Sequence, residues 1–244
     1  MTEQKDSMPG TARLVLVTGA SRGVGRATAK ALVELHGCTV VAVSRDEDCL
    51  ASLKTECGDR AGLLEALQVD LVSTSGIEDV RRHLAGRRLH GLVNNAGLLI
   101  KREWGEWTED DLQRLYLLNA SVPLLLSQAL SSLLEGDPPG HIVNIGSMGG
   151  FQGSVKFPGL AAYSASKAAL ANTTECMAEE LKDRGVRCNC ICLGAVDTAM
   201  LRTAFPGYTA PVGAEEVGRY ISRFVVEGHN LFNGKVLPLA VSTP

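Results

Sequence analysis

The residues with the clearest chemical potential are Tyr163 and Lys167, which lie four apart in the sequence Tyr-Ser-Ala-Ser-Lys. The segment is rich in alanine and predicts a helix, so both side chains should project from one face. A free phenol loses its proton near pH ~10, and a neighbouring ammonium favours the anion. The spacing therefore predicts a tyrosine with a lowered pKa that exchanges a proton near neutrality. Because such a pair also occurs by chance, it needs support from the rest of the chain.

A glycine-rich turn offers a place for phosphate groups. The sequence Thr18-Gly-Ala-Ser-Arg-Gly-Val-Gly25 follows a short apolar run and opens a helical pattern. Glycines let the backbone approach a pyrophosphate, and the unpaired N–H groups of a helix N-terminus favour anions. The spacing differs from the commonest fingerprint, and an ordinary strand-to-helix connection is the alternative. The flanking strand and helix favour nucleotide binding, with these candidate contacts: Gly19, Ser21, Arg22, Gly23, Val24 and Gly25.

The end of the second apolar run bears on which nucleotide is bound. NAD-binding proteins of this architecture place an acidic residue about 20 positions beyond the glycines, on the ribose hydroxyls. Here that position is Arg45, preceded by Ser44. Together with Arg22 these residues could neutralise a 2′-phosphate. The sequence predicts NADP(H) rather than NAD(H), and a solvent-exposed arginine beside Asp46 is the alternative.

Short apolar runs alternate with helical patterns along the chain. A helix is expected at 46–57, others fill the gaps, and the candidate strands are 13–18, 39–44, 64–69, 91–93, 141–145, 186–193 and 235–241. This alternation predicts an α/β fold, a Rossmann-type doubly wound parallel sheet flanked by helices on both faces. No repeat or linker divides the chain, so residues 13–244 are expected to form a single dinucleotide-binding catalytic domain. The irregular stretch 198–213 is a candidate lid.

Composition and charge exclude several function classes. The formal net charge is -3, and no run of like charge marks a nucleic-acid-binding segment. Residues 1–12 are polar, lack the apolar stretch of a signal peptide and are expected to be a flexible tail. No apolar run approaches the roughly 18 residues of a membrane span. We therefore expect a cytoplasmic protein with no nucleic-acid or membrane partner.

Cysteine usage argues against a disulfide framework or a metal centre. The chain has 7 cysteines and no Cys-x-x-Cys pair. Cys188, Cys190 and Cys192 share one face of an expected strand, where three thiols could bind a metal. An apolar strand without a companion histidine cluster favours buried free thiols instead. We predict no metal site.

These motifs together resemble those of the short-chain dehydrogenase/reductase family in its single-domain form, from about residue 13 to the C-terminus. Beyond the glycine turn and the Tyr163–Lys167 pair, the chain has Asp70 after the third strand and Asn94-Asn-Ala-Gly97 after the fourth. Asn119 lies in the next helix, and Ser147 follows Asn-Ile-Gly. The shared order and spacing make the resemblance specific.

The resemblance implies a role for each of these residues. Tyr163 would donate the proton during carbonyl reduction, Lys167 would lower its pKa and bind the nicotinamide ribose, and Ser147 would orient the substrate oxygen. Asn119 would hold a water that connects the lysine to solvent. The other implied cofactor contacts are Asp70 and Leu71 at the adenine, Asn94, Ala96 and Gly97 beneath the cofactor, and Gly194, Val196 and Thr198 near the carboxamide and pyrophosphate.

The resemblance also implies assembly, and the chain departs from the family in three places. Alanines at 161, 162, 165, 168, 169 and 171 would let a partner helix approach, as in a homodimer or homotetramer. The Ser147 to Tyr163 interval is three residues longer than usual and rich in glycine, which should reshape the substrate mouth. Leu193-Gly194 replaces the usual Pro-Gly, and the terminal glycine pair is absent.

The leading functional prediction is an NADP(H)-dependent oxidoreductase that acts on a carbonyl or secondary-alcohol substrate. The sequence resembles both carbonyl reductases and 3-oxoacyl carrier-protein reductases, and a carrier protein would need a basic dock. Lys101, Arg102 and Arg202 are candidates for that dock. The alternative from another class is a catalytically silent NADP(H)-sensing binding protein, which would usually lose the tyrosine or lysine. A nucleotide-sugar epimerase or dehydratase is disfavoured by the short C-terminal portion.

Overall fold

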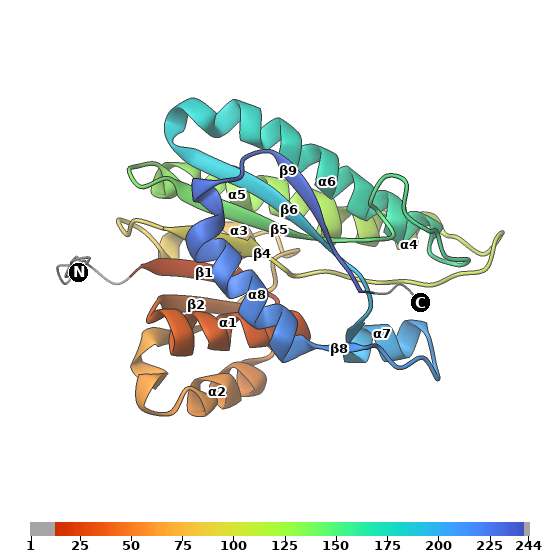
Figure 1. The fold of residues 1–244 in the computed structure, drawn as a ribbon, viewed down its shortest axis with the longest axis horizontal. Helices are drawn as coiled ribbons and strands as arrows, with labels where there is room; N and C mark the ends of the chain where they lie inside the picture. The colour runs from red at the N-terminus through yellow and green to blue at the C-terminus, as the bar shows by residue number, and fades with distance from the viewer. Residues whose placement is uncertain (1–12, 242–244) are drawn as a thin grey trace, which may run out of the picture.

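Seven parallel strands form the central sheet of the computed structural model, which describes residues 13–241 (Figure 1). Their order is β3-β2-β1-β4-β5-β6-β9, and a separate small sheet pairs β7 with β8. The strands are β1 Leu14–Thr18, β2 Thr39–Ser44, β3 Leu64–Gln68, β4 Gly91–Asn94, β5 Gly140–Ser147, β6 Val186–Leu193, β7 Val196–Asp197, β8 Val212–Gly213 and β9 Lys235–Leu239. The doubly wound parallel fold is thereby confirmed. The expected tail at 1–12 lies outside the described residues.

The strands form where the sequence is apolar and β-branched, because both faces of a parallel sheet are covered. All five residues of β1 and the four central residues of β2 are buried. The predicted strand positions hold to within a few residues. β5 extends beyond the expected 141–145 because it pairs with β6 along its whole length, from Gly140 opposite Val186 to Ser147 opposite Leu193.

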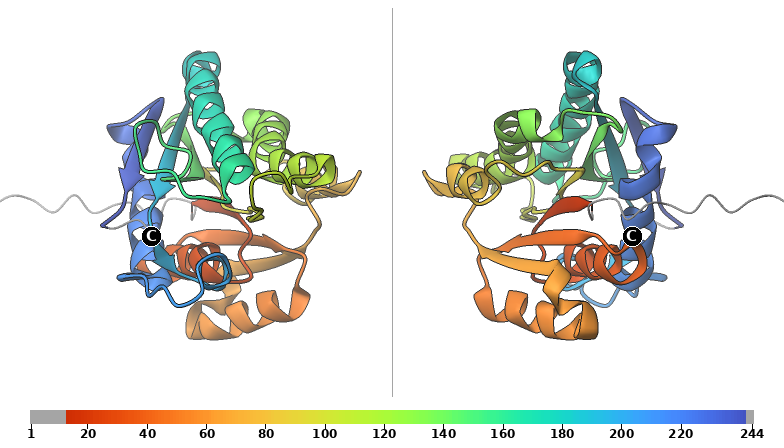
Figure 2. Two further views of the ribbon diagram at one scale, coloured as in Figure 1. Left: turned by 90° about the vertical axis from the view of Figure 1, so that its right-hand side faces the viewer. Right: turned by 90° about the vertical axis from the view of Figure 1, so that its left-hand side faces the viewer.

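Helices cover both faces of the sheet. Figure 2 shows α1 and α2 on one side, and α5 and α6 on the other. The residues from α1, α2 and α8 pack in one apolar cluster and those from α3, α5 and α6 mainly in a second. The helices are α1 Gly23–His36, α2 Glu47–Glu56, α3 Gly76–His83, α4 Glu109–Tyr116, α5 Val122–Leu134, α6 Ala161–Leu181, α7 Ala199–Ala204 and α8 Ala214–Glu227, with 3-10 turns at Gly58–Leu63, Lys182–Arg184 and Gly228–Asn230.

The helical run Glu109–Leu134 joins α4 and α5 through a π-helical segment at Leu117–Ser121. By length and composition alone this run is apolar enough to cross a membrane. Core helices of globular proteins meet the same criterion, and Leu126, Leu130 and Leu134 of this run are fully buried against the sheet. Packing against the sheet therefore explains part of its apolar character, since 39% of its most apolar window is buried.

The strand order reverses between β1 and β4. From β1 the chain builds outward to β2 and β3, then returns to β4 and builds outward on the other side. In an open parallel sheet, connections that diverge at such a point leave a crevice at the carboxyl ends of the strands, where ligands bind. The glycine turn follows β1, and Asn94 to Gly97 follow β4. The topology thus brings both predicted cofactor segments to the crevice.

A buried histidine lies inside β5. The ring Nδ1 of His141 is 3.1 Å from the Val225 carbonyl oxygen, and Nε2 is 2.9 Å from the amide nitrogen of Asn189. Asn189 is itself held, because its amide also donates to Phe232 O and its oxygen accepts the Lys235 N–H. This pattern fits the neutral imidazole with its proton on Nδ1. Burial lowers the pKa of His141 to about 4.

Stability should therefore decline in acid through His141. Well above pH 6.5, the pKa of free imidazole, the ring is neutral in both the folded and the unfolded chain. As the pH falls from there toward about 4, only the unfolded chain gains the proton, which lowers the free energy of unfolding by about 3 kcal/mol. We expect His141→Gln to flatten this acid decline in urea denaturation between pH about 7 and about 4. The difference between the two plots of unfolding free energy against pH gives the contribution of His141. Parallel plots would contradict the assignment of a buried, neutral histidine.

Candidate active site

A cleft of about 790 Å³ opens at the carboxyl ends of the strands. This volume lies in the range of small-molecule and cofactor sites. The glycine turn, the ends of β2 and β3, the segment after β4, and α7 all contribute to its walls. The predicted residues that line it are Gly19, Ser21, Arg22, Gly23, Val24, Ser44, Arg45, Asp70, Leu71, Ala96, Gly97, Ser147, Tyr163, Lys167, Gly194, Val196 and Thr198.

Three predicted residues lie behind the cleft wall. A Cβ added to Gly25 would lie 2.2 Å from the amide nitrogen of Asn95, so this glycine permits close packing. Asn94 is buried and donates to Asn144 Oδ1 at 2.8 Å, which links β4 to β5. Asn119 is also buried. These three residues therefore lie outside the cleft lining, whereas Asn95, which was not in the predicted set, lines it.

The glycine turn fits a pyrophosphate on several counts. Gly19 and Gly23 have φ values of 66° and 56°, in the left-handed region that favours glycine. A Cβ at Gly19 would lie 2.8 Å from Ala96 Cα, so a side chain there would collide with the backbone after β4. No side chain caps the N-terminus of α1 and no acidic residue lies in its first turn. The amides at this helix start are thus suited to an anion.

Two exposed arginines stand at the β2 side of the cleft. Arg22 and Arg45 line it, and neither guanidinium forms a hydrogen-bonded ion pair with any residue between 13 and 241. The nearby carboxylate of Asp46 caps α2 and accepts the Cys49 N–H at 2.9 Å. That hydrogen bond is the main cause that lowers the pKa of Asp46. Cationic groups are therefore available at the position where NAD-binding proteins carry an acid.

Tyr163 lies near the start of α6, and Ser147 is the last residue of β5; both side chains line the cleft. The Ser147 hydroxyl accepts the Gly149 N–H at 3.2 Å. Burial raises the pKa of Tyr163, although the neighbouring Ser147 side chain opposes this. The sequence-based expectation of a lowered pKa is therefore not met in this structure.

The ammonium of Lys167 explains the difference. It donates to the Ile145 carbonyl oxygen at 2.8 Å from a fully buried position one turn after Tyr163. Burial also lowers the pKa of Lys167 to about 8. The carbonyl of Ile145 on β5 therefore holds this cation in place.

Asn119 lies in the middle of the π-helical segment Leu117–Ser121. Its side chain makes two hydrogen bonds of 2.8 Å to the backbone of Leu98, and its amide also donates to Ser166 Oγ at 3.0 Å. A Cβ at Gly97 would lie 3.3 Å from Asn119 Oδ1 and 3.4 Å from Lys167 Nζ. Asn119 therefore fixes the segment after β4 beside the lysine, a contribution that the sequence alone did not reveal.

The cysteines are all free thiols. Cys188, Cys190 and Cys192 are buried in β6, in agreement with the sequence-based interpretation. Burial and the contact with Cys192 raise the pKa of Cys190. Within residues 13–241, no three histidine, cysteine or acidic side chains gather as a metal-binding group.

The expected lid region is more regular than predicted. Residues 198–213 contain α7 and β8, and the Thr198 hydroxyl caps α7 by accepting the Leu201 N–H at 3.2 Å. Threonine at an N-cap is a helix-start signal that was available in the sequence. Two apolar residues of the cleft come from segments that the sequence had singled out, Phe157 from the lengthened loop before Tyr163 and Phe205 from the stretch 198–213. Other apolar cleft residues were missed because only the tertiary fold brings them together: Leu98, Leu99, Met148 and Leu160.

Comparison with known proteins agrees with this architecture. The family described as short chain dehydrogenase matches residues 13–209. Carbonyl reductase (NADPH) 2 of Sus scrofa is 38% identical over 190 residues, covering 77% of this chain and 73% of the relative. A 3-oxoacyl-(acyl-carrier-protein) reductase of Synechocystis sp. is 33% identical, covering 78% and 76%. The Pseudomonas aeruginosa RhlG/NADP active-site complex has a TM-score of 0.82 at 26% identity, covering 95% and 96%.

The family match extends over most of the chain and includes the glycine turn, Ser147, Tyr163 and Lys167. These segments meet at one cleft in the expected fold. The chain therefore belongs to the short-chain dehydrogenase/reductase family and is an oxidoreductase that uses a nicotinamide cofactor.

Proposed function

We propose that the chain is an NADP(H)-dependent oxidoreductase that transfers a hydride between nicotinamide and a carbonyl or secondary-alcohol substrate. The observation that carries the proposal is the meeting of Ser147, Tyr163 and Lys167 at one cleft wall, with Lys167 one helical turn after Tyr163. A hydroxyl, a phenol and an ammonium together can orient a carbonyl oxygen and supply its proton.

The proposed roles follow from the positions of the side chains. Tyr163 donates its phenolic proton to the carbonyl oxygen, and Ser147 orients that oxygen and stabilises the negative charge that develops on it. Lys167 holds the nicotinamide ribose, and Asn119 keeps the backbone after β4 in register with the lysine. The bound nicotinamide would supply the hydride.

The environment of Tyr163 sets the protonation state of its phenol. Burial raises its pKa, which keeps the phenol protonated, and the protonated phenol is the form that donates during reduction. Oxidation of an alcohol needs the phenolate, which burial disfavours. The ionisation of this phenol should therefore not reduce the rate of carbonyl reduction just above neutral pH.

Replacing the phenol tests the mechanism. Tyr163→Phe removes the proton donor and keeps the ring, so the turnover number for ketone reduction should fall by about two to four orders of magnitude. NADPH should still bind with a dissociation constant close to that of the unaltered protein, measured by fluorescence. Near-normal turnover in Tyr163→Phe would refute the assigned chemistry. If the unaltered protein binds NADPH but turns over no substrate, the result would support a sensing function.

The preference for NADP(H) is proposed from Arg22, Ser44 and Arg45. Both guanidinium groups are exposed at the cleft, and Asp46 is engaged at the N-cap of α2. A 2′-phosphate would form charge-assisted hydrogen bonds with such groups, whereas a 2′-hydroxyl would not. The name of the Sus scrofa relative, which specifies NADPH, supports the same choice.

Charge reversal tests the cofactor preference. NADPH should bind the unaltered protein about tenfold or more tightly than NADH, since hydrogen bonds to charged groups contribute about 1.5–3 kcal/mol each. Arg45→Asp should reverse this order in a fluorescence titration of both cofactors. Arg82→Asp, on α3 and outside the cleft lining, is the matched control and should leave the order unchanged. Equal affinities in the unaltered protein would show that the arginines do not select the phosphate.

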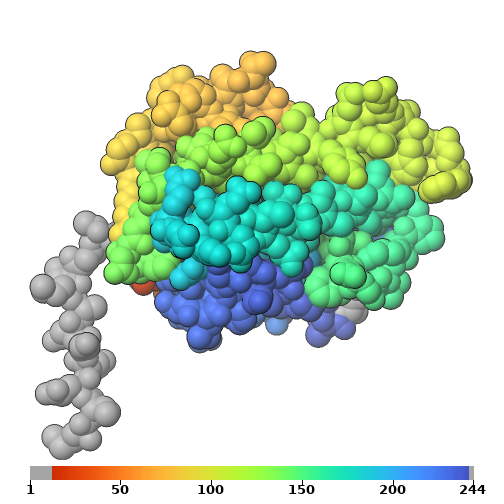
Figure 3. Space-filling view, turned by 90° about the horizontal axis from the view of Figure 1, so that it is seen from above, coloured from red at the N-terminus to blue at the C-terminus, as the bar shows by residue number. Residues whose placement is uncertain are grey.

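A homodimer or homotetramer is proposed from the face formed by α4, α5 and α6, which Figure 3 includes. Ala161, Ala165 and Ala168 are exposed along one side of α6, whereas Ala171 is buried against the sheet. The exposed apolar side chains on the neighbouring run are Leu112, Tyr116, Leu117, Leu124 and Leu125. Such a patch indicates an interface between copies of the chain.

Sedimentation tests this assembly. The protein should sediment at a multiple of its 25.9 kDa chain mass at micromolar concentration. Leu125→Glu should shift it toward the monomer, because a charge would be buried in the interface. Leu35→Glu on α1, at a leucine that is also exposed but lies outside the patch, should not. A monomer in the unaltered protein would refute the proposal.

The cytoplasm is the proposed compartment. All 7 cysteines are free thiols, which suits a reducing environment. The proposed partners are the small-molecule substrate and further copies of the chain, with no nucleic acid and no membrane.

A further inference from the structure

An apolar chamber surrounds Tyr163 at one end of the cleft. Phe157, from the loop between β5 and α6, meets Phe205 at the end of α7 edge to face, with ring centroids 5.7 Å apart. Three segments that are distant in sequence thus contribute to one wall. By apolar chamber we mean the five residues that line the cleft and pack around Tyr163: Leu98, Leu99, Phe157, Leu160 and Phe205.

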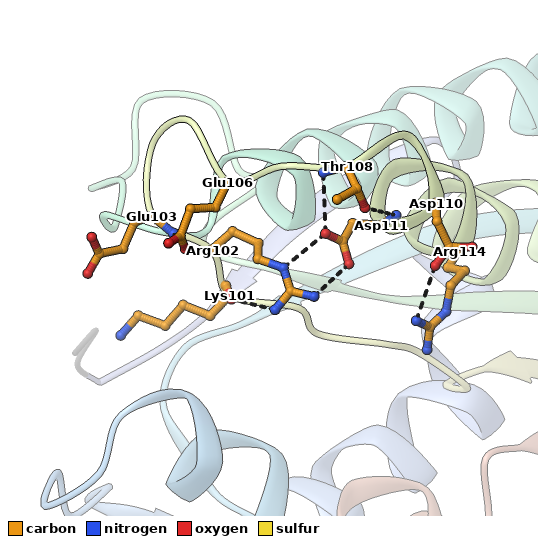
Figure 4. Close-up of polar contacts among 8 residues, drawn as sticks. All are labelled: Lys101, Arg102, Glu103, Glu106, Thr108, Asp110, Asp111 and Arg114. Atoms are coloured by element: carbon orange, nitrogen blue, oxygen red, sulfur yellow. Dashed lines mark hydrogen bonds and ion pairs between the residues drawn. The ribbon is translucent and has the colours of Figure 1, made fainter.

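The segment beside this chamber is anchored firmly. Arg102 makes two hydrogen bonds of 2.9 Å to the carboxylate of Asp111, and Figure 4 shows this pairing. Asp111 is buried and forms a capping box with Thr108 at the start of α4. The bonds from Arg102 are the main cause that lowers the pKa of Asp111. Arg102 therefore holds the segment after β4 against α4 and is not a free cation.

Lys101 points away from that ion pair, as Figure 4 shows. Its ammonium donates to the Ala204 carbonyl oxygen at 3.0 Å and lies 4.9 Å from the centre of the Phe205 ring. The Ala204 carbonyl belongs to the last residue of α7, where a cation is favoured by the helix dipole and by carbonyls without helical partners. Lys101 thus connects the segment after β4 to α7 on the far side of the chamber wall.

The long loop between β5 and α6 lies close to the aliphatic part of the Lys101 side chain. A Cβ at Gly159 would lie 2.9 Å from Lys101 Cγ, and the φ of Gly159 is 79°. The Arg102 N–H donates to the Gly159 carbonyl oxygen at 3.1 Å. The close approach at Gly159 requires glycine, so the lengthened loop directs Lys101 toward α7.

The third basic side chain near the chamber is engaged as well. Arg202 of α7 forms an ion pair with Asp197. Lys101, Arg102 and Arg202, which the sequence offered as a basic dock for a carrier protein, therefore all have partners within the chain. An acidic carrier would have to break these contacts to bind there.

We infer that Lys101 fastens α7 over an apolar chamber that admits a free, uncharged carbonyl compound, an inference that rests on the proposed function. The substrate would place its carbonyl oxygen at Tyr163 and Ser147 and its apolar body against the chamber. Lys101 acts as a positioning residue, because its contacts are with α7 and not with the reacting atoms.

The rate of cleavage by trypsin reports whether Lys101 holds α7 in place, because Arg202 is an exposed cleavage site on α7 itself. Lys101→Met removes the ammonium and keeps much of the stem, so cleavage after Arg202 should become about fivefold faster. Lys101→Arg should restore the slower rate. Cleavage is followed by the mass of the released fragments, without substrate, and therefore does not depend on activity.

A matched control is provided by Lys156, whose ammonium also donates to a backbone carbonyl, that of Phe151, but within its own loop. Lys156→Met should leave cleavage after Arg202 unchanged. Equal cleavage rates in Lys101→Met and the unaltered protein would overturn the fastening. So would a failure of Lys101→Arg to restore the slower rate.

The substrate class is tested by presenting the same acyl group as a thioester of two different thiols. The 3-oxobutanoyl thioester of N-acetylcysteamine is uncharged, whereas that of coenzyme A carries several phosphate charges. We expect kcat/KM to be about tenfold or more higher for the uncharged thioester, mainly through KM. Lys101→Met should raise KM for it about fivefold and leave kcat nearly constant, since a smaller fraction of molecules would be closed.

The outcomes separate the two proposals. Equal or better turnover of the coenzyme A thioester would overturn the uncharged-substrate inference and support a carrier-bound substrate. If neither thioester nor any simple ketone is reduced, the proposed function fails, and the substrate inference falls with it. The trypsin comparison would still decide whether Lys101 holds α7.

Discussion

The cleft depends on the tight attachment of the backbone after β1 to the backbone after β4. Thr18 Oγ1 accepts the N–H groups of Asn95 and Ala96, both at 3.0 Å, and donates to the Val93 carbonyl. The Asn95 amide donates to the carbonyl oxygens of Thr18 and Gly19. These bonds join positions 75 to 78 apart in sequence and satisfy polar groups that would be costly to bury unpaired. The backbone segments after β1 and β4 are thus joined into one surface, which forms the floor of the cleft.

This attachment also explains why the glycines serve two purposes. Gly19 and Gly23 adopt the left-handed conformation at the cleft surface, where the backbone must approach a phosphate. Gly25 lies behind them, and a Cβ there would collide with the Asn95 amide and the Gly19 carbonyl. A side chain at Gly25 would therefore displace the floor itself. The phosphate turn and the segment after β4 are constrained as a unit.

The sequence predicted the parallel sheet and the segments that meet at the cleft, because apolar runs and turn residues are local signals. It could not predict the ionisation of Tyr163. The spacing to Lys167 suggested a lowered pKa, but burial raises it, and the ammonium is held by Ile145 on another element. The burial of a group and its partners across the sheet depend on tertiary packing. For the same reason the π-helical segment around Asn119 had no clear signal in the sequence, and the contact of Phe205 with Phe157 could not be predicted.

The two ends of the cleft differ in whether their basic side chains have partners within the chain. At the β2 end, Asp46 is engaged in capping α2, while Arg22 and Arg45 have no hydrogen-bonded ion-pair partner among residues 13–241. At the other end, Lys101 is engaged by α7 and Arg202 by Asp197. A free guanidinium attracts a phosphate, whereas a paired one adds little net field.

The rules of helix stabilisation contribute to this difference, because Asp46 caps the start of one helix and Lys101 contacts the last residue of another. Asp46 stabilises the start of α2 and Lys101 the end of α7. If Asp46 and Lys101 lost their helix partners, the class of ligand favoured at each end of the cleft would change. A free acid at position 46 would repel a 2′-phosphate, and a free ammonium at position 101 would attract anionic substrates. Under the proposed function, the side chains that stabilise these helix ends also set the ligand preference of the cleft.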